Sequence, residues 1–180
     1  MLMRCFIAID VPKNLQKSLV EIQERMRESG VKLVEPENFH ITLKFLGEVE
    51  EPLLTEIKNW LSKLNFPKFR VELRGIGFFP NESFVRVVFI RCLSKELERL
   101  GKLVNDELER YGFRKEEFVG HLTLARVKRR LSRNVLNELS KIRNIYIGEF
   151  VAEEVKLKRS ELRPTGPIYG DLFTVKLGEG

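Results

Sequence analysis

The apolar residues of this chain form two kinds of pattern that follow each other in a regular order. Short runs rich in β-branched and aromatic residues are typical of strands, whereas apolar positions spaced by three and four are typical of amphipathic helices. In the first half they predict a strand at 4–9, a helix opened by Pro12, a strand at 39–45, a helix opened by Pro52 and a strand at 69–80. The apolar stripes of the two helices are Leu15, Leu19, Ile22 and Met26, and Leu53, Ile57, Trp60, Leu61 and Leu64.

The second half of the chain repeats this order of elements. The pattern predicts a strand at 84–92, a helix with Ser94 as its N-cap, a strand from 121, a helix capped by Ser132 and a strand from 149. The apolar stripes of these two helices are Leu97, Leu100, Val104, Leu108 and Tyr111, and Leu136, Leu139 and Ile142.

Corresponding elements of the two halves stay close to 81 residues apart, which indicates an internal duplication. We therefore predict an α+β fold with a single bilobal domain over 1–180 and approximate repeats at 1–81 and 82–162. Each lobe would be an antiparallel sheet with helices on its outer face, and a cleft would lie between the lobes. The turn-rich segment "RPTGPIYG" at 163–170 then leads to a terminal strand at 171–177, which could pair with either lobe.

The two histidines of the chain lie in the same short motif, His-apolar-Thr-apolar. His40 and Thr42 occur in "FHITLKFLGEV", and His121 and Thr123 occur 81 residues later in "GHLTLARVKRR". A lone histidine on a strand is usually a core or surface residue without chemistry. A second copy, set in a repeat of the surrounding elements, favours a shared function.

Strand geometry predicts which side chains of each motif face the same way, because successive residues point to opposite faces. In the first copy the polar face carries His40, Thr42 and Lys44, and the apolar face carries Ile41, Leu43 and Phe45. In the second copy the polar face carries His121 and Thr123, and the apolar face carries Leu122 and Leu124. If an approximate two-fold axis relates the copies, both histidines converge in one groove.

Composition narrows the class of partner and of site. The net charge of +6 favours an anionic partner, of which nucleic acid is the commonest. No apolar run approaches the roughly 20 residues of a membrane span, and "MLMRCFIAIDVP" is too short for a secretory signal, so we predict a cytoplasmic protein without membrane contact. Cys5 and Cys92 lie in apolar runs, as buried thiols of a reducing compartment do. Two histidines and no CxxC pair argue against a zinc site, and we predict no metal and no cofactor.

Two histidines beside threonine hydroxyls in a basic cleft suit one class of reaction. An imidazole titrates near pH 6.5, so one ring can start as a base and the other as an acid. Threonine hydroxyls can donate hydrogen bonds to anionic oxygens. These residues therefore predict metal-free cleavage of a phosphodiester, in which the base activates water or a hydroxyl and the acid protonates the departing oxygen.

Four segments of the chain resemble one known family. The opening "RCFIAID", the motif segments "FHITLKFLGEV" and "GHLTLARV", and the closing "LKRSELRPTGPIYG" are similar to the RNA 2′,3′-cyclic phosphodiesterase branch, also called 2′-5′ RNA ligase, of the two-histidine phosphoesterase superfamily. The resemblance implies hydrolysis of a terminal 2′,3′-cyclic phosphate on RNA to a 2′-phosphate. It also implies reversible, ATP-independent joining of such an end to a 5′-hydroxyl, and the chain has neither a G-x-x-x-x-G-K-[ST] loop nor a K-x-D-G motif.

The resemblance also implies a role for each polar residue of the motifs. His40 would be the proton donor and His121 the acceptor, with the two roles open to reversal, and Thr42 and Thr123 would bind the phosphate. Arg126 matches an arginine that follows the second motif in relatives, where it helps to hold phosphate or the RNA end. Strict alternation puts Arg126 on the apolar face, so this role requires a bend at the end of the strand; otherwise it is a paired or exposed charge.

Other residues near the motifs have two interpretations each. Tyr169 lies in the turn-rich segment and is a candidate for stacking on a base, because turns expose aromatic rings. Phe45 is expected in the core rather than as a stacking platform. Lys44 either meets the RNA backbone or is a solvated strand lysine, and the basic run 128–130 is either a solvated face or a track for the RNA backbone.

Three functions from different classes remain open. The first is a phosphodiesterase that acts on RNA ends, with tRNA fragments as one candidate substrate. The second is an RNA-end-binding protein whose histidines only contact phosphate, and turnover of a cyclic nucleotide separates it from the first. The third is a phosphoesterase of a small nucleotide or a sugar cyclic phosphate. The basic charge of the chain favours a polymeric substrate over these small molecules. We expect a monomer whose partners are RNA ends or cyclic nucleotides.

Overall fold

The computed structural model describes residues 1–178 and shows a mixed α and β fold. The elements in chain order are β1 (Leu2–Asp10), α1 (Gln16–Glu24), β2 (Val31–Leu33), β3 (His40–Glu50), α2 (Glu51–Ser62), β4 (Phe69–Asn81), β5 (Phe84–Leu93), α3 (Lys95–Glu109), β6 (His121–Val127), α4 (Arg133–Lys141), β7 (Tyr146–Ala152), β8 (Glu154–Arg163) and β9 (Gly166–Lys176). Short 3-10 turns at Lys13–Leu15 and Pro36–Asn38 precede α1 and β3. No helix of the described residues is long and apolar enough to cross a membrane.

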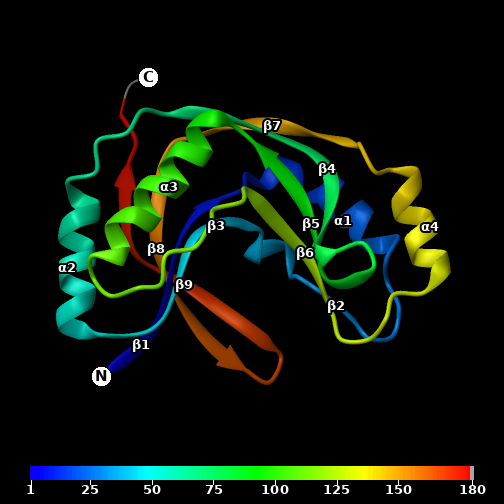
Figure 1. Cartoon of the computed structure of the whole chain (residues 1–180), viewed down its shortest axis with the longest axis horizontal. Helices are drawn as coiled ribbons and strands as arrows, with labels where there is room; N and C mark the ends of the chain where they lie inside the picture. The colour runs from blue at the N-terminus through cyan, green and yellow to red at the C-terminus, as the bar shows by residue number, and fades with distance from the viewer. Residues whose placement is uncertain (179–180) are drawn as a thin grey trace.

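The strands form one curled antiparallel sheet in the order β7-β4-β5-β6-β3-β1-β8-β9, and β2 also pairs with β6. The sheet has two wings, one formed by β3, β1, β8 and β9 and the other by β6, β5, β4 and β7. The helices lie on the outer side of the sheet, with α2 and α3 over the first wing and α1 and α4 over the second (Figure 1). The two motif strands β3 and β6 are neighbours at the centre of the order. The predicted two-winged α+β architecture with outer helices is confirmed.

The two wings do not coincide with the two halves of the chain. Helix α1 follows the first strand of one wing but packs against β6 of the other, and α3 follows β5 but packs against β3. Strand β4 of the first half likewise pairs with β5 and β7 of the second. The two halves of the chain therefore exchange elements, and neither wing is built from one half alone.

Helix α3 illustrates how local sequence and packing agree. Its first turn is capped by Ser94, whose hydroxyl accepts a hydrogen bond from the backbone N–H of Leu97 at 3.1 Å. Leu97, Leu100, Val104 and Leu108 are fully buried. The predicted cap of α4 is also present, because the Ser132 hydroxyl accepts from Val135 N–H at 3.1 Å.

The strand predicted from 149 is wrong in its extent, because the segment forms two strands. β7 begins earlier, at Tyr146, and ends at Ala152, and β8 begins at Glu154. β7 pairs with β4 in one wing and β8 pairs with β1 in the other. Alternation of apolar and polar residues specifies the faces of a strand but not its partner, so the sequence pattern did not reveal where the chain changes wings.

Candidate active site

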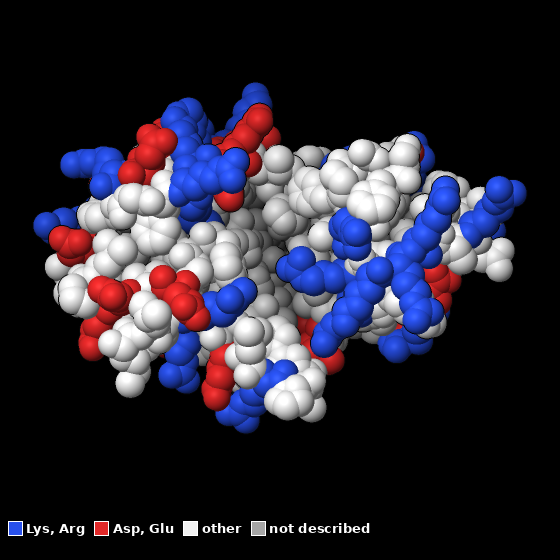
Figure 2. Space-filling view, turned by 60° about the horizontal axis from the view of Figure 1, so that its bottom comes forward, with Lys and Arg blue, Asp and Glu red and all other residues white. Residues whose placement is uncertain are grey.

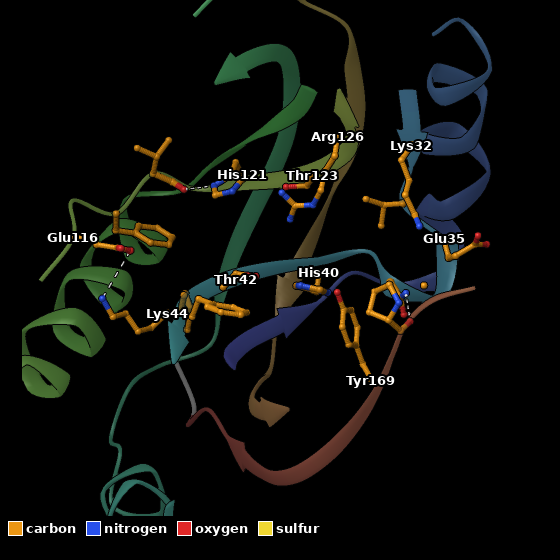
Figure 3. Close-up of a pocket in the computed structure, with 18 of the residues that line it drawn as sticks. Lys32, Glu35, His40, Thr42, Lys44, Glu116, His121, Thr123, Arg126 and Tyr169 are labelled. Carbon is orange, nitrogen blue, oxygen red and sulfur yellow. Dashed lines mark hydrogen bonds and ion pairs between the residues drawn. The ribbon is translucent and has the colours of Figure 1, made fainter. Parts of the chain in front are cut away.

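A cleft with a volume of about 410 Å³ lies on the concave side of the sheet, at the seam between β3 and β6. Its lining comes from β3, β6 and β9 and from segments near 32–38 and 116–119 (Figure 3). The six residues predicted for the site all line it, and they are His40, Thr42, His121, Thr123, Arg126 and Tyr169.

The backbone register at the seam explains how the two motifs meet. Ile41 pairs with Leu122 on the antiparallel strands β3 and β6, and both side chains are fully buried on the outer side. The neighbouring residues therefore point into the cleft, with each histidine opposite the threonine of the other motif. The approximate two-fold axis proposed for the repeat passes through this pair of residues.

A β-bulge on β6 decides where Arg126 points. Thr123 pairs with Phe89 of β5, but the next pair is Ala125 with Val88, so Leu124 is an extra residue on β6. An extra residue shifts the alternation by one position. Arg126 consequently lies on the same face as His121 and Thr123 and lines the cleft (Figure 3). The structure thus contains the bend on which the predicted position of Arg126 depended.

The equivalent bulge on β3 overturns the prediction for Phe45. Thr42 pairs with Ala8 of β1, but the next pair is Lys44 with Ile7, so Leu43 is the extra residue. Phe45 therefore faces the cleft side and is 48% exposed, and the guanidinium of Arg4 lies 5.0 Å from its ring centroid. The expectation that Phe45 belongs to the core is wrong.

The same bulge turns Lys44 to the buried side. Its ammonium group donates to the backbone carbonyl of Arg114 and lies 3.8 Å from a carboxylate oxygen of Glu116 (Figure 3). Only 4% of Lys44 is exposed, so it is not a solvated strand lysine. It lines the cleft, and its ammonium group is engaged by the loop at Arg114. It thereby ties β3 to the loop that precedes His121.

The surroundings of His40 favour its neutral form. Its ring lies 4.9 Å from that of Phe6 and 5.3 Å from that of Tyr169, centroid to centroid. Burial, and to a lesser extent the charge of Lys158, lowers the pKa of His40 to about 4, while Asp10 acts in the opposite direction. His40 is therefore neutral at pH 7 in the free protein.

His121 has a defined orientation and tautomer. Its Nδ1 lies 2.7 Å from the carbonyl oxygen of Val119, which can only accept a hydrogen bond, so Nδ1 carries the proton and donates it. Nε2 of the neutral ring is then the acceptor. Burial lowers the pKa of His121, the hydrogen bond to Val119 opposes this shift, and the charge of Arg126 adds to it. Phe79 and Phe89 flank the ring at centroid distances of 5.0 and 5.4 Å.

The charges that flank the two histidines differ despite the repeat. Asp10 is the cross-strand partner of His40, whereas Arg91 is the partner of His121.

Asp10 also belongs to a compact ion cluster that sequence reasoning missed. Its two carboxylate oxygens lie 3.0 Å from Lys158 Nζ and 2.9 Å from Lys156 Nζ, and both lysines contact Asp171 at 2.7 and 2.9 Å. The alternation of Lys156 and Lys158 with buried Val155 and Leu157 was the available sequence signal.

Tyr169 lies in the cleft, but not in a turn. The turn of the segment 163–170 is confined to Pro164 and Thr165. The terminal strand predicted at 171–177 begins earlier, at Gly166, so the predicted extent of the turn-rich segment is wrong. Tyr169 pairs with Ser160 of β8 and presents its ring edge-on to His40 (Figure 3). Hairpin pairing between β8 and β9, a non-local contact, overrides the turn tendency of glycine and proline here.

Strand β2 contributes a cleft residue that sequence reasoning did not single out. Lys32 pairs across the strands with Arg126 and lines the same end of the cleft. Three residues do not make a recognisable strand pattern, so the pairing of β2 with β6 had no clear sequence signal. Glu35 lies near Lys32 in the lining, so the two cations leave this end of the cleft with an excess of positive charge (Figure 3).

Fold and site together define a class of protein. The family model LigT like Phosphoesterase matches residues 9–90 and again 88–169, and the chain belongs to this family. The double match agrees with the duplication inferred from the two motifs, and the family resemblance stated from the motifs is confirmed.

Curated relatives carry a more specific name. The chain is 42% identical over 169 residues to the RNA 2′,3′-cyclic phosphodiesterase of Methanocaldococcus jannaschii, covering 93% of this chain and 96% of the relative. It is 43% identical over 173 residues to the protein of the same name from Archaeoglobus fulgidus, covering 94% and 98%. A crystal structure of a Thermus thermophilus protein matches with a TM-score of 0.81 and 35% identity, over 99% of this chain and 100% of that one.

Proposed function

We propose that the protein hydrolyses the 2′,3′-cyclic phosphate at the end of an RNA to a 2′-phosphate. The observation that carries the proposal is the placement of both His-apolar-Thr-apolar motifs on neighbouring strands, with all four polar side chains in one cleft. The name shared by the curated relatives supports the same reaction and substrate. The net charge of +6 supports a polyanionic substrate over a small sugar cyclic phosphate.

His121 acts as the base and His40 as the acid in the proposed reaction. Nε2 of His121 accepts a proton from water, the water oxygen attacks phosphorus, and the bond from phosphorus to the 3′-oxygen breaks as His40 protonates that oxygen. The product keeps its phosphate on the 2′-oxygen. The hydrogen bond from His121 Nδ1 to the Val119 carbonyl supports this assignment, because it leaves Nε2 of the neutral ring free to accept a proton.

Binding of the substrate allows His40 to act as an acid. Its pKa of about 4 keeps the ring neutral in the free protein. A phosphate anion bound beside the ring favours the charged imidazolium, because opposite charges raise the pKa of a base. His40 therefore gains its proton together with the substrate and releases it to the departing 3′-oxygen.

The remaining polar residues of the cleft hold the substrate. Thr42 and Thr123 donate hydroxyl hydrogen bonds to phosphate oxygens, and Arg126 offers a charged donor to the same group. Tyr169 limits the cleft beside His40 and contacts the terminal nucleoside. None of these steps requires a metal ion, and no cluster of three or more His, Cys, Asp or Glu suited to a metal ion exists among residues 1–178.

Ligation is the same chemistry with a different nucleophile. If the 5′-hydroxyl of a second RNA replaces water, His121 takes its proton and its oxygen attacks phosphorus. The bond to the 3′-oxygen again breaks, and a 2′-5′ phosphodiester forms. The strained cyclic ester supplies the free energy, so the joining reaction needs no ATP.

The identity of the product tests the proposal. The protein is incubated in EDTA and without ATP with an RNA that ends in a 2′,3′-cyclic phosphate, and the product isomer is determined by chromatography against 2′- and 3′-phosphate standards. We expect the 2′-phosphate alone. A 3′-phosphate product, binding without turnover, or activity that returns only when a divalent ion is added would each contradict the proposed mechanism.

A further inference from the structure

A second groove lies outside the cleft, between the tip of the β4–β5 hairpin and the segment that follows β6. Its volume is about 510 Å³. The residues that line it are Glu82, Ser83, Phe84, Val85, Arg86, Lys128, Arg129, Arg130, Leu131 and Leu136. Lys and Arg side chains gather on the wing at the right of the central hollow in Figure 2, where few acidic residues interrupt them.

The positive charge of this groove is not compensated. Arg86 and the run 128–130 take part in none of the ion pairs formed among residues 1–178. The one carboxylate of the lining, Glu82, is held by Arg143 at 2.7 Å. Four exposed cations around a hollow concentrate a positive potential that attracts an extended anion.

The backbone that carries the basic run is fixed in place. Lys128 N–H donates to the carbonyl of Gly30 at 2.7 Å, and Ser132 N–H donates to a carboxylate oxygen of Glu28 at 2.9 Å. Gly30 has φ +87°, and a Cβ atom there would lie 2.9 Å from Arg129 Cβ, so the absence of a side chain at Gly30 lets Arg129 lie across it. The run is therefore an ordered ridge beside the groove.

The groove also contains an aromatic ring. Phe84 is 56% exposed, and the Arg86 guanidinium lies 4.7 Å from its centroid. Exposed aromatic rings interleaved with cations are typical of surfaces that bind single-stranded nucleic acid, because bases stack on the rings while cations follow the phosphates.

Strand β6 connects the groove to the catalytic cleft. Arg126 lines the cleft and Lys128 lines the groove, and the two are separated by two positions, or about 7 Å along an extended chain. Lys32, paired with Arg126, widens this connection. An RNA strand that leaves the cleft past Arg126 meets Lys128 within about one nucleotide.

We propose that this second groove binds the single-stranded RNA segment on the 5′ side of the terminal cyclic nucleotide. Arg86 and the run 128–130 hold successive phosphates, and Phe84 stacks on a base. The inference rests on the proposed function, because it assigns a path to the remainder of that substrate. The efficiency of hydrolysis then depends on the length of the RNA as well as on its terminal phosphate.

The test compares substrates that share an end but differ in length. For the wild type we expect kcat/KM to rise at least tenfold from 2′,3′-cyclic CMP to an octanucleotide with the same 3′ end. The Lys128→Ala/Arg129→Ala/Arg130→Ala variant should lose most of that rise and keep kcat/KM for cyclic CMP within about twofold. The matched control is Lys13→Ala/Lys17→Ala/Lys63→Ala, which removes the same charge from exposed positions near α1 and α2 and should retain the rise.

A binding measurement separates failure of this inference from failure of the proposed function. The dissociation constant of a fluorescent octanucleotide with a 3′-hydroxyl end is measured by anisotropy as salt is varied, which requires no turnover. The groove variant should bind at least tenfold more weakly, and the slope of log K against log salt should shrink by about 2, as expected for three lost phosphate contacts on a single strand. Equal effects of the groove and control variants, or an unchanged rise of kcat/KM with length in the groove variant, would overturn the assignment.

Discussion

His40 and His121 occupy equivalent positions of a repeat, yet their neighbours make them chemically different. Burial lowers the pKa of both rings. At His40 the charge of Lys158 adds to this effect and Asp10 opposes it, whereas at His121 the hydrogen bond to Val119 opposes it and Arg126 adds to it. The difference follows from residues that the motif itself does not contain. In the proposed mechanism, a duplicated frame thereby supplies an acid and a base from the same residue type.

The low pKa of His40 predicts a pH dependence of stability. The unfolded protein binds a proton at this residue below about pH 6.5, while the folded protein does so only near pH 4. The contribution of His40 to stability is therefore complete above pH 6.5 and is lost as the pH falls toward 4. A His40→Gln variant lacks this loss, so its free energy of unfolding should fall less between pH 7 and pH 4.5, by about 1–3 kcal/mol.

The measurement is urea denaturation of both proteins at the two pH values, without ligand. A Lys63→Gln variant serves as the control, because this exposed lysine does not titrate in that range. If the wild type and His40→Gln lose equal stability on acidification, the ring is not held neutral in the folded protein.

At the scale of the element, the two bulges explain what strand alternation predicted and what it missed. Alternation placed the histidines and threonines correctly, because it holds on the part of β3 and β6 before the bulges. It failed at Phe45 and left Arg126 on the wrong face, and these two positions are themselves separated by 81 residues. A bulge depends on pairing with another strand. Alternation within one strand therefore does not reveal a bulge, and the prediction fails at the equivalent position of each half.

Lys44 is the clearest case of an element held by one buried side chain. It joins β3 to the loop at 114–116, which leads to His121. A Lys44→Met variant keeps most of the volume but leaves the Arg114 carbonyl without its donor, at a cost of about 1–3 kcal/mol. We expect faster proteolytic cleavage in the segment 113–120 and a lower kcat.

Limited trypsin proteolysis followed by mass spectrometry measures this effect segment by segment. Lys63→Met is the matched control, since the same change at an exposed lysine should leave the segment 113–120 as resistant as in the wild type. Unchanged resistance in Lys44→Met would mean that the loop is held by other contacts.

At the scale of the whole molecule, the cleft that holds both histidines forms where the two halves of the chain meet. The sequence repeat predicted two similar wings and a shared groove, because the order of strands and helices recurs along the chain. It did not predict that α1 and α3 cross to the opposite wings or that β7 and β8 separate at Glu153. Such choices depend on long-range packing, which local periodicity does not encode.

The most direct test of the account measures hydrolysis by variants that lack one histidine. His40→Ala and His121→Ala are assayed in EDTA on an RNA ending in a 2′,3′-cyclic phosphate, with thermal unfolding as the check of folding. Each variant should lose about a hundred- to ten-thousandfold in turnover, the usual contribution of a positioned proton carrier. The double variant should be little worse than the weaker single variant, because the pair acts as a unit. A folded single variant that hydrolyses the cyclic phosphate at near the wild-type rate would contradict the two-histidine mechanism.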